Sequence, residues 1–244
     1  MSLIKRFERN NCGRDLIVGD VHGYFGRLQV AIDEVGFDPG RDRLFSVGDL
    51  VDRGPECDLA LEWLAKPWFH AVRGNHEDMA IRWPNGNMDA RNYVANGGGW
   101  NVSNPPELSR EFAEAFAALP IAMELETERG LVGIVHADCP FSSWEQFVEV
   151  LETEQLSGAL KKAVFEAAMW SRERISGHAS LDDVAGVRAV VVGHTPVQRA
   201  TSLGNVHYID TGGWFPAHRP EGRFTLLDAS TLRGATVSRL WEGA

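Results

Sequence analysis

The chain has 244 residues, of which 44% are hydrophobic and 24% charged, proportions that are ordinary for a soluble globular protein. Its formal net charge of −10 excludes an overall basic surface of the kind that binds nucleic-acid backbones. We therefore expect no nucleic-acid partner, and any phosphate group has to be attracted by a local cluster of positive charge. A chain of this length can bury a substantial core, and we expect a single domain over residues 1–244.

No segment of the sequence has the pattern of a signal peptide or a membrane span. Residues 1–10 are charged throughout and lack an apolar h-region, and the longest apolar runs, such as 189–192, are far too short to cross a bilayer. The cysteines, Cys12, Cys57 and Cys139, are widely spaced and typical of reduced thiols. We expect a cytoplasmic protein without a membrane partner.

Short apolar segments that end at a polar residue recur along the chain. They predict strands over residues 16–18, 44–47, 69–72, 131–135 and 190–192. The polar side chains that follow them, in chain order, are Asp20, Asp49, Asn75, His136 and His194. Ligands of open α/β sheets bind at the carboxyl ends of the strands, so we expect these side chains to converge at one end of a β-structure.

Helical patterns lie between several of these strands. Residues 24–35 place their apolar side chains on one stripe, and residues 56–64 are similar. The order strand, helix, strand predicts right-handed crossovers and a largely parallel sheet. Further helices are predicted over residues 108–119 and 149–169, the second with a break near 157–158.

The C-terminal part of the chain has the pattern of antiparallel strands. We predict them over residues 206–209, 224–227 and 236–241. A second sheet packed on the first, with helices outside, would bury both sets of strands. The predicted fold class is therefore α/β (α+β), with two packed β-sheets flanked by helices.

Three short blocks after the first strands carry residue types suited to metals and phosphate. In GDVHG at 19–23 the chain is extended, so Asp20 and His22 point the same way and can bind one ion. Two further blocks, GDLVDRG at 48–54 and RGNHE at 73–77, add Asp49, Asp52, Arg53, Asn75 and His76. One block alone is explained as a turn or helix cap, but three together favour a functional site.

In this order and spacing, the three blocks resemble the signature blocks of the PPP-type metallophosphatases. The resemblance continues with HAD at 136–138, WSRER at 170–174, GHT at 193–195 and DTG at 210–212. It covers about residues 14–227 and is closest to the small bacterial and lambda-type serine/threonine protein phosphatases. It implies the calcineurin-like metallophosphatase fold.

The resemblance also implies a role for each matching position. Metal ligands would be Asp20, His22, Asp49, Asn75, His136 and His194, with Asp49 bridging two ions. His76 would be the general acid oriented by Asp52, and Arg53 and Arg172 would bind phosphate oxygens. The implied activity is hydrolysis of phosphoserine or phosphothreonine in phosphoproteins and phosphopeptides, and phosphotyrosine fits the same chemistry.

These roles agree with the chemistry of the residue types. A carboxylate shared by two divalent cations lets them lie about 3.5–4 Å apart, where they stabilise both the attacking and the leaving oxygen. A protonated imidazole serves a poor alkoxide leaving group, and planar guanidinium groups match a phosphoryl group. Oxygen and imidazole ligands without thiolate suit Mn²⁺, Fe²⁺ or Zn²⁺, and we expect two Mn²⁺ ions.

Some roles are open at this level. Arg172 and Arg174 are both candidates for the second phosphate contact, and the preceding Trp-Ser pair favours Arg172. Asp138 and Asp210 are either partners of the metal-binding histidines or turn residues. The segment NGGGW at 96–100 predicts a loop, whose tryptophan either lines a substrate groove or packs in the core.

Other classes of protein share part of the pattern. Dinucleoside-polyphosphate hydrolases share GDVHG and use the same metals on a pyrophosphate, but the Asp52-Arg53 pair and the RGNHE block favour a protein phosphatase. A broad phosphodiesterase is a further alternative. An inactive metal-binding scaffold would lack a ligand or the acid, and here every such position is filled.

Overall fold

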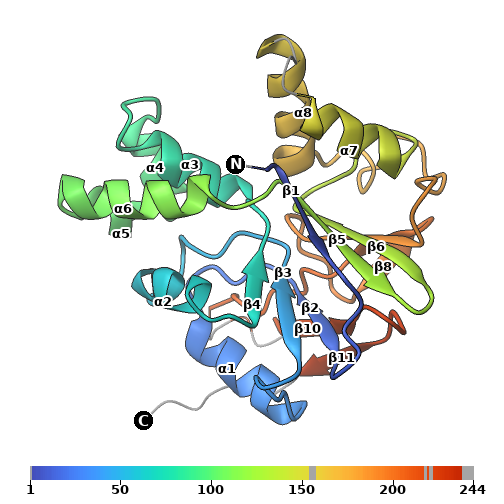
Figure 1. Cartoon of the computed structure of the whole chain (residues 1–244). Helices are drawn as coiled ribbons and strands as arrows, with labels where there is room; N and C mark the ends of the chain where they lie inside the picture. Colours follow the sequence, from blue (N-terminus) through green and yellow to red (C-terminus); the bar gives the residue numbers. More distant parts are fainter. Residues whose placement is uncertain (1, 154–157, 217–218, 220–221, 238–244) are drawn as a thin grey trace.

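Two mixed β-sheets form the centre of the computed structural model, which describes residues 2–153, 158–216, 219 and 222–237 (Figure 1). The six-stranded sheet has the order β1-β5-β6-β7-β9-β8. Its strands are β1 (Ile4–Phe7), β5 (Ala122–Thr127), β6 (Gly130–Val135), β7 (Ala189–Val192), β8 (Thr201–Leu203) and β9 (Val206–Tyr208). Strands β6, β7 and β9 run parallel, whereas β5 and β6 form an antiparallel hairpin.

The five-stranded sheet has the order β11-β10-β2-β3-β4. Its strands are β2 (Asp15–Val18), β3 (Arg43–Ser46), β4 (Phe69–Ala71), β10 (Phe224–Asp228) and β11 (Gly234–Val237). Strands β2, β3 and β4 are parallel, and β10 adds antiparallel to β2. The carboxyl ends of β2, β3 and β4 therefore lie at one edge of this sheet.

Helices cover the outer face of each sheet. Those packed in one cluster with the five-stranded sheet are α1 (Phe25–Glu34), α2 (Ala60–Leu64), α3 (Asn75–Arg82) and α6 (Pro106–Ala117), with η1 (Cys57–Leu59), α4 (Ala90–Ala95) and α5 (Gly99–Val102) beside them. The six-stranded sheet is covered by α7 (Trp144–Glu152) and α8 (Gly158–Trp170).

Alternation along the strands divides the core between two helix-covered layers and a central layer. On β2, Leu16 and Val18 pack under the helices, whereas Ile17 faces the other sheet. Residues of the central layer from both sheets include Ile17, Phe45, Met123, Ile134 and Val191. Because both faces of these strands are buried, they appear in the sequence as continuous apolar runs.

The predicted fold class, two packed sheets flanked by helices, is confirmed. The prediction of one largely parallel sheet is wrong, because the strands that precede the polar residues divide between two mixed sheets. The predicted C-terminal run of antiparallel strands is confirmed for β10 and β11, which pair antiparallel, and is wrong for β9. Strand β9 pairs parallel to β7, and β10 pairs with β2 in the other sheet, since their partners are distant in the sequence. Residues 238–241 of that prediction lie outside the described residues.

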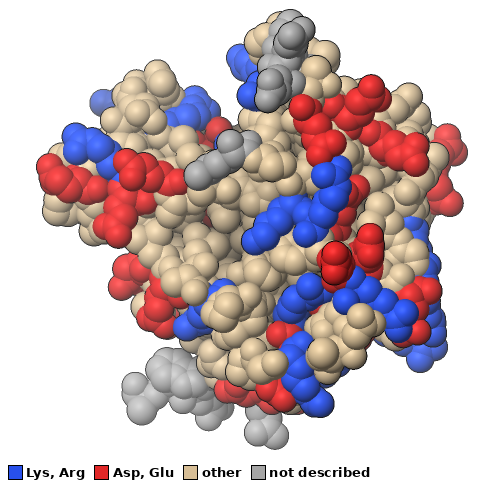
Figure 2. All heavy atoms as spheres, in the orientation of Figure 1, with Lys and Arg blue, Asp and Glu red and all other residues tan. Residues whose placement is uncertain are grey.

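Strands β1, β5 and β8 were not predicted. The helix predicted over 149–169 with a break near 157–158 is divided as expected, into α7, which ends at Glu152, and α8, which begins at Gly158. Residues 154–157 of that prediction lie outside the described residues. On the face shown in Figure 2, acidic side chains gather over α6 and α7, in keeping with the net negative charge. Within the described ranges, no helix combines the length and the apolar character needed to cross a bilayer.

Gly133 on β6 allows α7 to pack closely on its sheet. A Cβ at this position would lie 2.5 Å from the Trp144 ring, which is held by a 2.8 Å hydrogen bond from its Nε1 to Glu124 Oε1. We expect Gly133→Ala to lower the free energy of unfolding by about 1–3 kcal/mol in urea denaturation, because the rigid indole must move. Gly99→Ala, which has no atom within 4 Å, is the control. Equal stability of the two variants would contradict this packing argument.

Candidate metal centre

Polar side chains from both sheets meet where β2, β3, β4, β6 and β7 end. All the side chains predicted as metal ligands are buried, and none exposes more than 6% of its surface: Asp20, His22, Asp49, Asn75, His136 and His194. The convergence expected from the strand ends is thus present in the structure, although the strands belong to different sheets.

Asp49 lies at the centre of this group. Its Oδ2 is 3.6 Å from His22 Nε2, and its Oδ1 is 3.4 Å from His136 Nε2. Two sets of side chains suited to a metal ion share this residue, one with His22 and His76 and the other with His136 and His194. A carboxylate with one oxygen toward each set has the arrangement needed to bridge two cations.

The second set is completed by an amide oxygen. Asn75 Oδ1 lies 3.0 Å from His136 Nε2 and 2.9 Å from His194 Nδ1, and the two ring nitrogens are 3.2 Å apart. On the other side of Asp49, Asp20 Oδ2 lies 3.8 Å from His22 Nε2. Oxygen and nitrogen lone pairs thus face one another on both sides of Asp49.

Backbone carbonyl groups fix the tautomers of two histidines. Nδ1 of His22 donates to Val51 O at 2.9 Å, and Nδ1 of His136 donates to Val47 O at 2.7 Å. Nε2 of each neutral ring therefore carries a lone pair that faces Asp49, as a metal ligand requires. His194 Nε2 is buried and has no hydrogen-bond partner among the described residues.

Burial and like charge make the cluster unfavourable without cations. Burial, Asp210 and Asp49 raise the pKa of Asp20 well above its usual value, and burial raises the pKa of Asp210 to about 6. Burial, followed by the charge of His136, lowers the pKa of His194 to about 3. Divalent cations would offset the repulsion between these carboxylates. The side chains present therefore fit a two-cation centre, and their oxygen and imidazole donors suit Mn²⁺, Fe²⁺ or Zn²⁺.

Several residues at the site have a strained backbone. His22, Asp49, Asp52, Arg53 and His194 have φ between 46° and 70°, a left-handed conformation that residues other than glycine rarely adopt. Such strain persists only where surrounding contacts over-determine the backbone, and it concentrates at functional sites.

Glu77, the last residue of the RGNHE block, provides such contacts for Asp49. Its buried carboxylate accepts hydrogen bonds from the backbone N–H groups of Asp49 at 2.9 Å, Leu50 at 2.7 Å and Gly74 at 2.8 Å. The Asp49 carbonyl in turn accepts from His22 N at 2.8 Å. Sequence reasoning assigned no role to Glu77, although its place in the block was a signal.

A histidine and a carboxylate stand beside the candidate ligands. His76 Nδ1 donates to Asp52 Oδ2 at 2.7 Å, and both side chains are fully buried. The guanidinium of Arg53 donates to His76 Nε2 at 3.0 Å and to His22 Nε2 at 2.8 Å. Arg53 thus lies between the histidine predicted as the acid and one predicted ligand.

Two tryptophans that the sequence left without a defined role contact these groups. Trp100 Nε1 donates to Asp52 Oδ1 at 2.7 Å. Trp214 Nε1 donates to Asp210 Oδ1 at 3.2 Å, and its ring lies 4.4 Å from the Arg53 guanidinium carbon. Of the two acidic residues left open, Asp210 therefore adjoins the cluster.

The two arginines near residue 172 have different surroundings. Arg174 is buried, and its guanidinium donates to Asp138 Oδ1 at 3.2 Å and to the carbonyls of Ser180 and Asp182. Asp138 accordingly pairs with Arg174 and not with a histidine. Arg172 is exposed, and its charge contributes, after burial and His136, to lowering the pKa of His194. Arg172 is thus the exposed arginine of the two, and Arg174 is engaged by buried partners.

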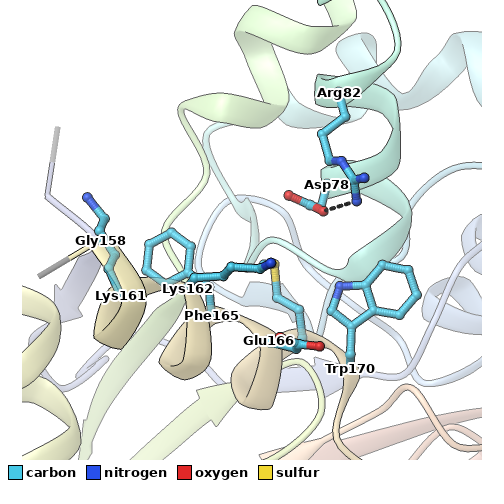
Figure 3. A pocket seen from close by; sticks show the side chains of 9 residues that line it. Asp78, Arg82, Gly158, Lys161, Lys162, Phe165, Glu166 and Trp170 are labelled. Carbon is cyan, nitrogen blue, oxygen red and sulfur yellow. Dashed lines mark ion pairs between the residues drawn. The ribbon is translucent and has the colours of Figure 1, made fainter. Parts of the chain in front are cut away.

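A pocket of about 740 Å³ lies between α3 and α8 (Figure 3). Asp78 and Arg82 line it from α3, where they form an ion pair of 3.5 Å, and Phe165 and Trp170 line it from α8. Helix α3 begins with Asn75 and His76, and α8 ends two residues before Arg172. The pocket therefore adjoins the cluster through both helices.

Comparison with known proteins places the chain in a family. Residues 14–198 match the family of calcineurin-like phosphoesterases, and the chain belongs to it. It is 34% identical over 216 residues to serine/threonine-protein phosphatase 1 of Salmonella typhimurium, covering 87% of this chain and 93% of that protein. A shorter match, 45% over 62 residues, relates 25% of the chain to 22% of the symmetrical bis(5'-nucleosyl)-tetraphosphatase of Pseudomonas fluorescens.

A solved structure shows the same fold. A protein serine/threonine phosphatase from Saccharomyces cerevisiae superposes with a TM-score of 0.61 at 16% identity, covering 99% of this chain and 85% of that chain. At this identity the likeness concerns the fold alone. Metallophosphatases of this family use divalent metal ions, which agrees with the buried donor set described above.

The surroundings of the two arginines predict different effects on stability. We expect Arg174→Ala to lower the free energy of unfolding by about 3 kcal/mol, because it leaves the buried Asp138 carboxylate without its partner. Arg172→Ala, at an exposed position, should change it by less than about 0.5 kcal/mol. Urea unfolding of both variants measures this, and a silent Arg174→Ala would show that the buried pair is not stabilising.

Metal content tests the central position of Asp49. We expect the chain to bind two divalent ions, and Asp49→Ala to lose most of both, because its oxygens face both sets of ligands. His76→Asn should keep the ions. Elemental analysis after dialysis against Mn²⁺ measures the ratio of metal to chain, and a full complement in Asp49→Ala would rule out the bridging role.

Proposed function

We propose that this chain is a protein phosphatase that hydrolyses phosphoserine and phosphothreonine, with phosphotyrosine as a further substrate. The observation that supports it best is the His76–Asp52 pair, joined at 2.7 Å beside the Asp49 cluster. Phosphoserine has a poor alkoxide leaving group, and a positioned imidazolium is the group that protonates it.

In this proposal Asp20, His22, Asp49, Asn75, His136 and His194 hold two divalent cations, with Mn²⁺ preferred over Fe²⁺ or Zn²⁺. When bound, the cations supply charge that stabilises the phosphoryl transition state and lowers the pKa of the attacking water. The chain supplies the remaining functions, which are binding of the phosphoryl oxygens and transfer of a proton to the leaving group.

Arg53 and Arg172 bind the phosphoryl oxygens. His22 Nε2 would hold a cation, and the Arg53 N–H group that donates to this nitrogen in the structure would then be available to the phosphoryl group. The face of Trp214 holds the guanidinium in place meanwhile. Planar guanidinium groups donate two parallel hydrogen bonds to a phosphoryl group, which fixes its orientation for attack.

His76 transfers the proton. In the structure Nε2 accepts from Arg53; once Arg53 donates to the phosphoryl group instead, Nε2 can take up a proton, and Asp52, which accepts from Nδ1, stabilises the imidazolium. Nε2 lies 3.8 Å from Asp49 Oδ2, which places it at the edge of the cluster, where the leaving oxygen would lie. The proton passes from Nε2 to that oxygen as the P–O bond breaks.

A dinucleoside polyphosphate is the second candidate substrate. Similarity to symmetrical bis(5'-nucleosyl)-tetraphosphatases supports it: 45% identity over 62 residues in Pseudomonas fluorescens, and 31% over 157 residues in a Shewanella species, which covers 64% of this chain and 55% of that protein. The phosphatase of Salmonella typhimurium is similar over most of the length of both proteins. We therefore favour the phosphomonoester.

Phosphate release from two substrates tests the proposal. We expect the Mn²⁺-loaded protein to act on a phosphoserine peptide with a kcat/KM at least about 10-fold above that for diadenosine tetraphosphate, and chelation to abolish both activities. His76→Asn should lower kcat on the peptide by about 10²–10⁴-fold, since the leaving group loses its acid.

His178→Asn, the same change at an exposed histidine outside the cluster, is the control and should be silent. A higher kcat/KM for diadenosine tetraphosphate would favour the second candidate. Near-normal turnover of the phosphoserine peptide by His76→Asn would show that another group is the acid.

A further inference from the structure

We propose that residues 96–100, the turn after α4 together with the first residues of α5, are a positioning element, which we call the turn. It acts on the acid His76 through Asp52, and on the phosphate-binding Arg53 through the backbone of that residue. The inference rests on the proposed function of His76 and Arg53. No residue of the turn is assigned a contact with substrate.

Trp100 completes the hydrogen bonds of the Asp52 carboxylate. Oδ1 accepts from Trp100 Nε1 at 2.7 Å, and Oδ2 accepts from His76 Nδ1 at 2.7 Å. Asp52 is fully buried, so an oxygen without a donor would be costly. With one donor on each oxygen, rotation of the carboxylate is restricted. Its hydrogen bond with His76 then fixes the plane and direction of the imidazole ring as well.

Gly97 supports the neighbouring residue, Arg53. The N–H of Arg53 donates to Gly97 O at 3.3 Å, while Arg53 itself is held at a φ of 70°. A Cβ on Gly97 would lie 2.4 Å from Arg53 N, and Gly97 has a φ of 99°. Both the close approach and the backbone conformation therefore require glycine.

The turn is itself attached to the helices around it. Gly98 N donates to Tyr93 O at 2.9 Å, and a Cβ on Gly98 would lie 2.2 Å from the buried Tyr93 ring. The Trp100 ring packs edge-on against Phe112 of α6 with centroids 4.8 Å apart. Tyr93 of α4 and Phe112 of α6 are buried. Through its contacts with them, the turn holds Asp52 and Arg53 at a fixed place relative to these helices.

Trp100→Phe removes the indole N–H and keeps an aromatic ring against Phe112. If Trp100 positions the acid, kcat on a phosphoserine peptide should fall about 10-fold, the effect of losing one hydrogen bond to a charged group. With p-nitrophenyl phosphate, whose leaving group departs with little protonation, kcat should stay within about threefold. Trp83→Phe is the matched control: Trp83 is also half-buried and packs against an aromatic ring, Tyr93.

A double variant identifies the residue through which Trp100 acts. In an Asp52→Asn background, Trp100→Phe should cause no further loss on the phosphoserine peptide, because the carboxylate it positions is already gone. Losses that multiply, equal losses on both substrates, or no loss at all would each overturn the role of Trp100. The thermal midpoint of each variant is measured alongside, to separate stability from turnover.

Gly97→Ala tests the arginine separately. Displacement of Arg53 should raise KM for both substrates and weaken inhibition by inorganic phosphate about 10-fold, with a smaller change in kcat. Gly86→Ala is the control, since Gly86 also has a positive φ, 71°, but no atom within 4 Å of a Cβ. Unchanged phosphate inhibition in Gly97→Ala would overturn the role of Gly97.

The wild type separates this inference from the proposed function. If it hydrolyses the phosphoserine peptide and Trp100→Phe and Gly97→Ala behave as their controls do, the positioning role is wrong and the function stands. If the wild type releases no phosphate from the peptide, the function is wrong, and the positioning role as stated falls with it.

Discussion

The mutual repulsion of buried carboxylates at the strand ends is the constraint on which the rest of the site depends. Asp20, Asp49 and Asp210 expose at most 2% of their surface, and burial, followed by the charges of Asp210 and Asp49, raises the pKa of Asp20. A fold retains such a group only where cations or strong donors offset the cost. Imidazole and amide lone pairs are directed at the same space. This set of groups is typical of a metal centre and not of an ordinary polar core.

Around this cluster, residues with a strained backbone are held by hydrogen bonds with buried side chains. Glu77 takes up three backbone N–H groups that hold Asp49 in its left-handed conformation. Indole N–H groups of Trp100 and Trp214 restrain Asp52 and Asp210 in the same manner. Contacts with the surrounding layer thus hold the ligands and the acid in position. The strained backbone that fixes this geometry lowers the stability of the fold.

The charge distribution explains how an acidic protein can accept a phosphate. The exposed surface over α6 and α7 is acidic, as the net charge of −10 requires. Arg53 lies at the cluster beside His22 and His76, where bound cations would add further positive charge. In the proposed function the attraction of the phosphate is therefore local.

Local sequence patterns determined the strands that end at Asp20, Asp49, Asn75, His136 and His194, because two-residue alternation and apolar runs report burial directly. The resemblance of the GDLVDRG and RGNHE blocks to those of the metallophosphatases likewise implied the His76–Asp52 pair. Only the tertiary structure decided that β9 and β10 join different sheets, since strand pairing depends on distant segments. It alone showed that Arg174 is buried against Asp138, and brought Trp100 to Asp52. The sequence neighbours of a side chain do not indicate which distant residues it contacts. Packing of the whole core selects those contacts.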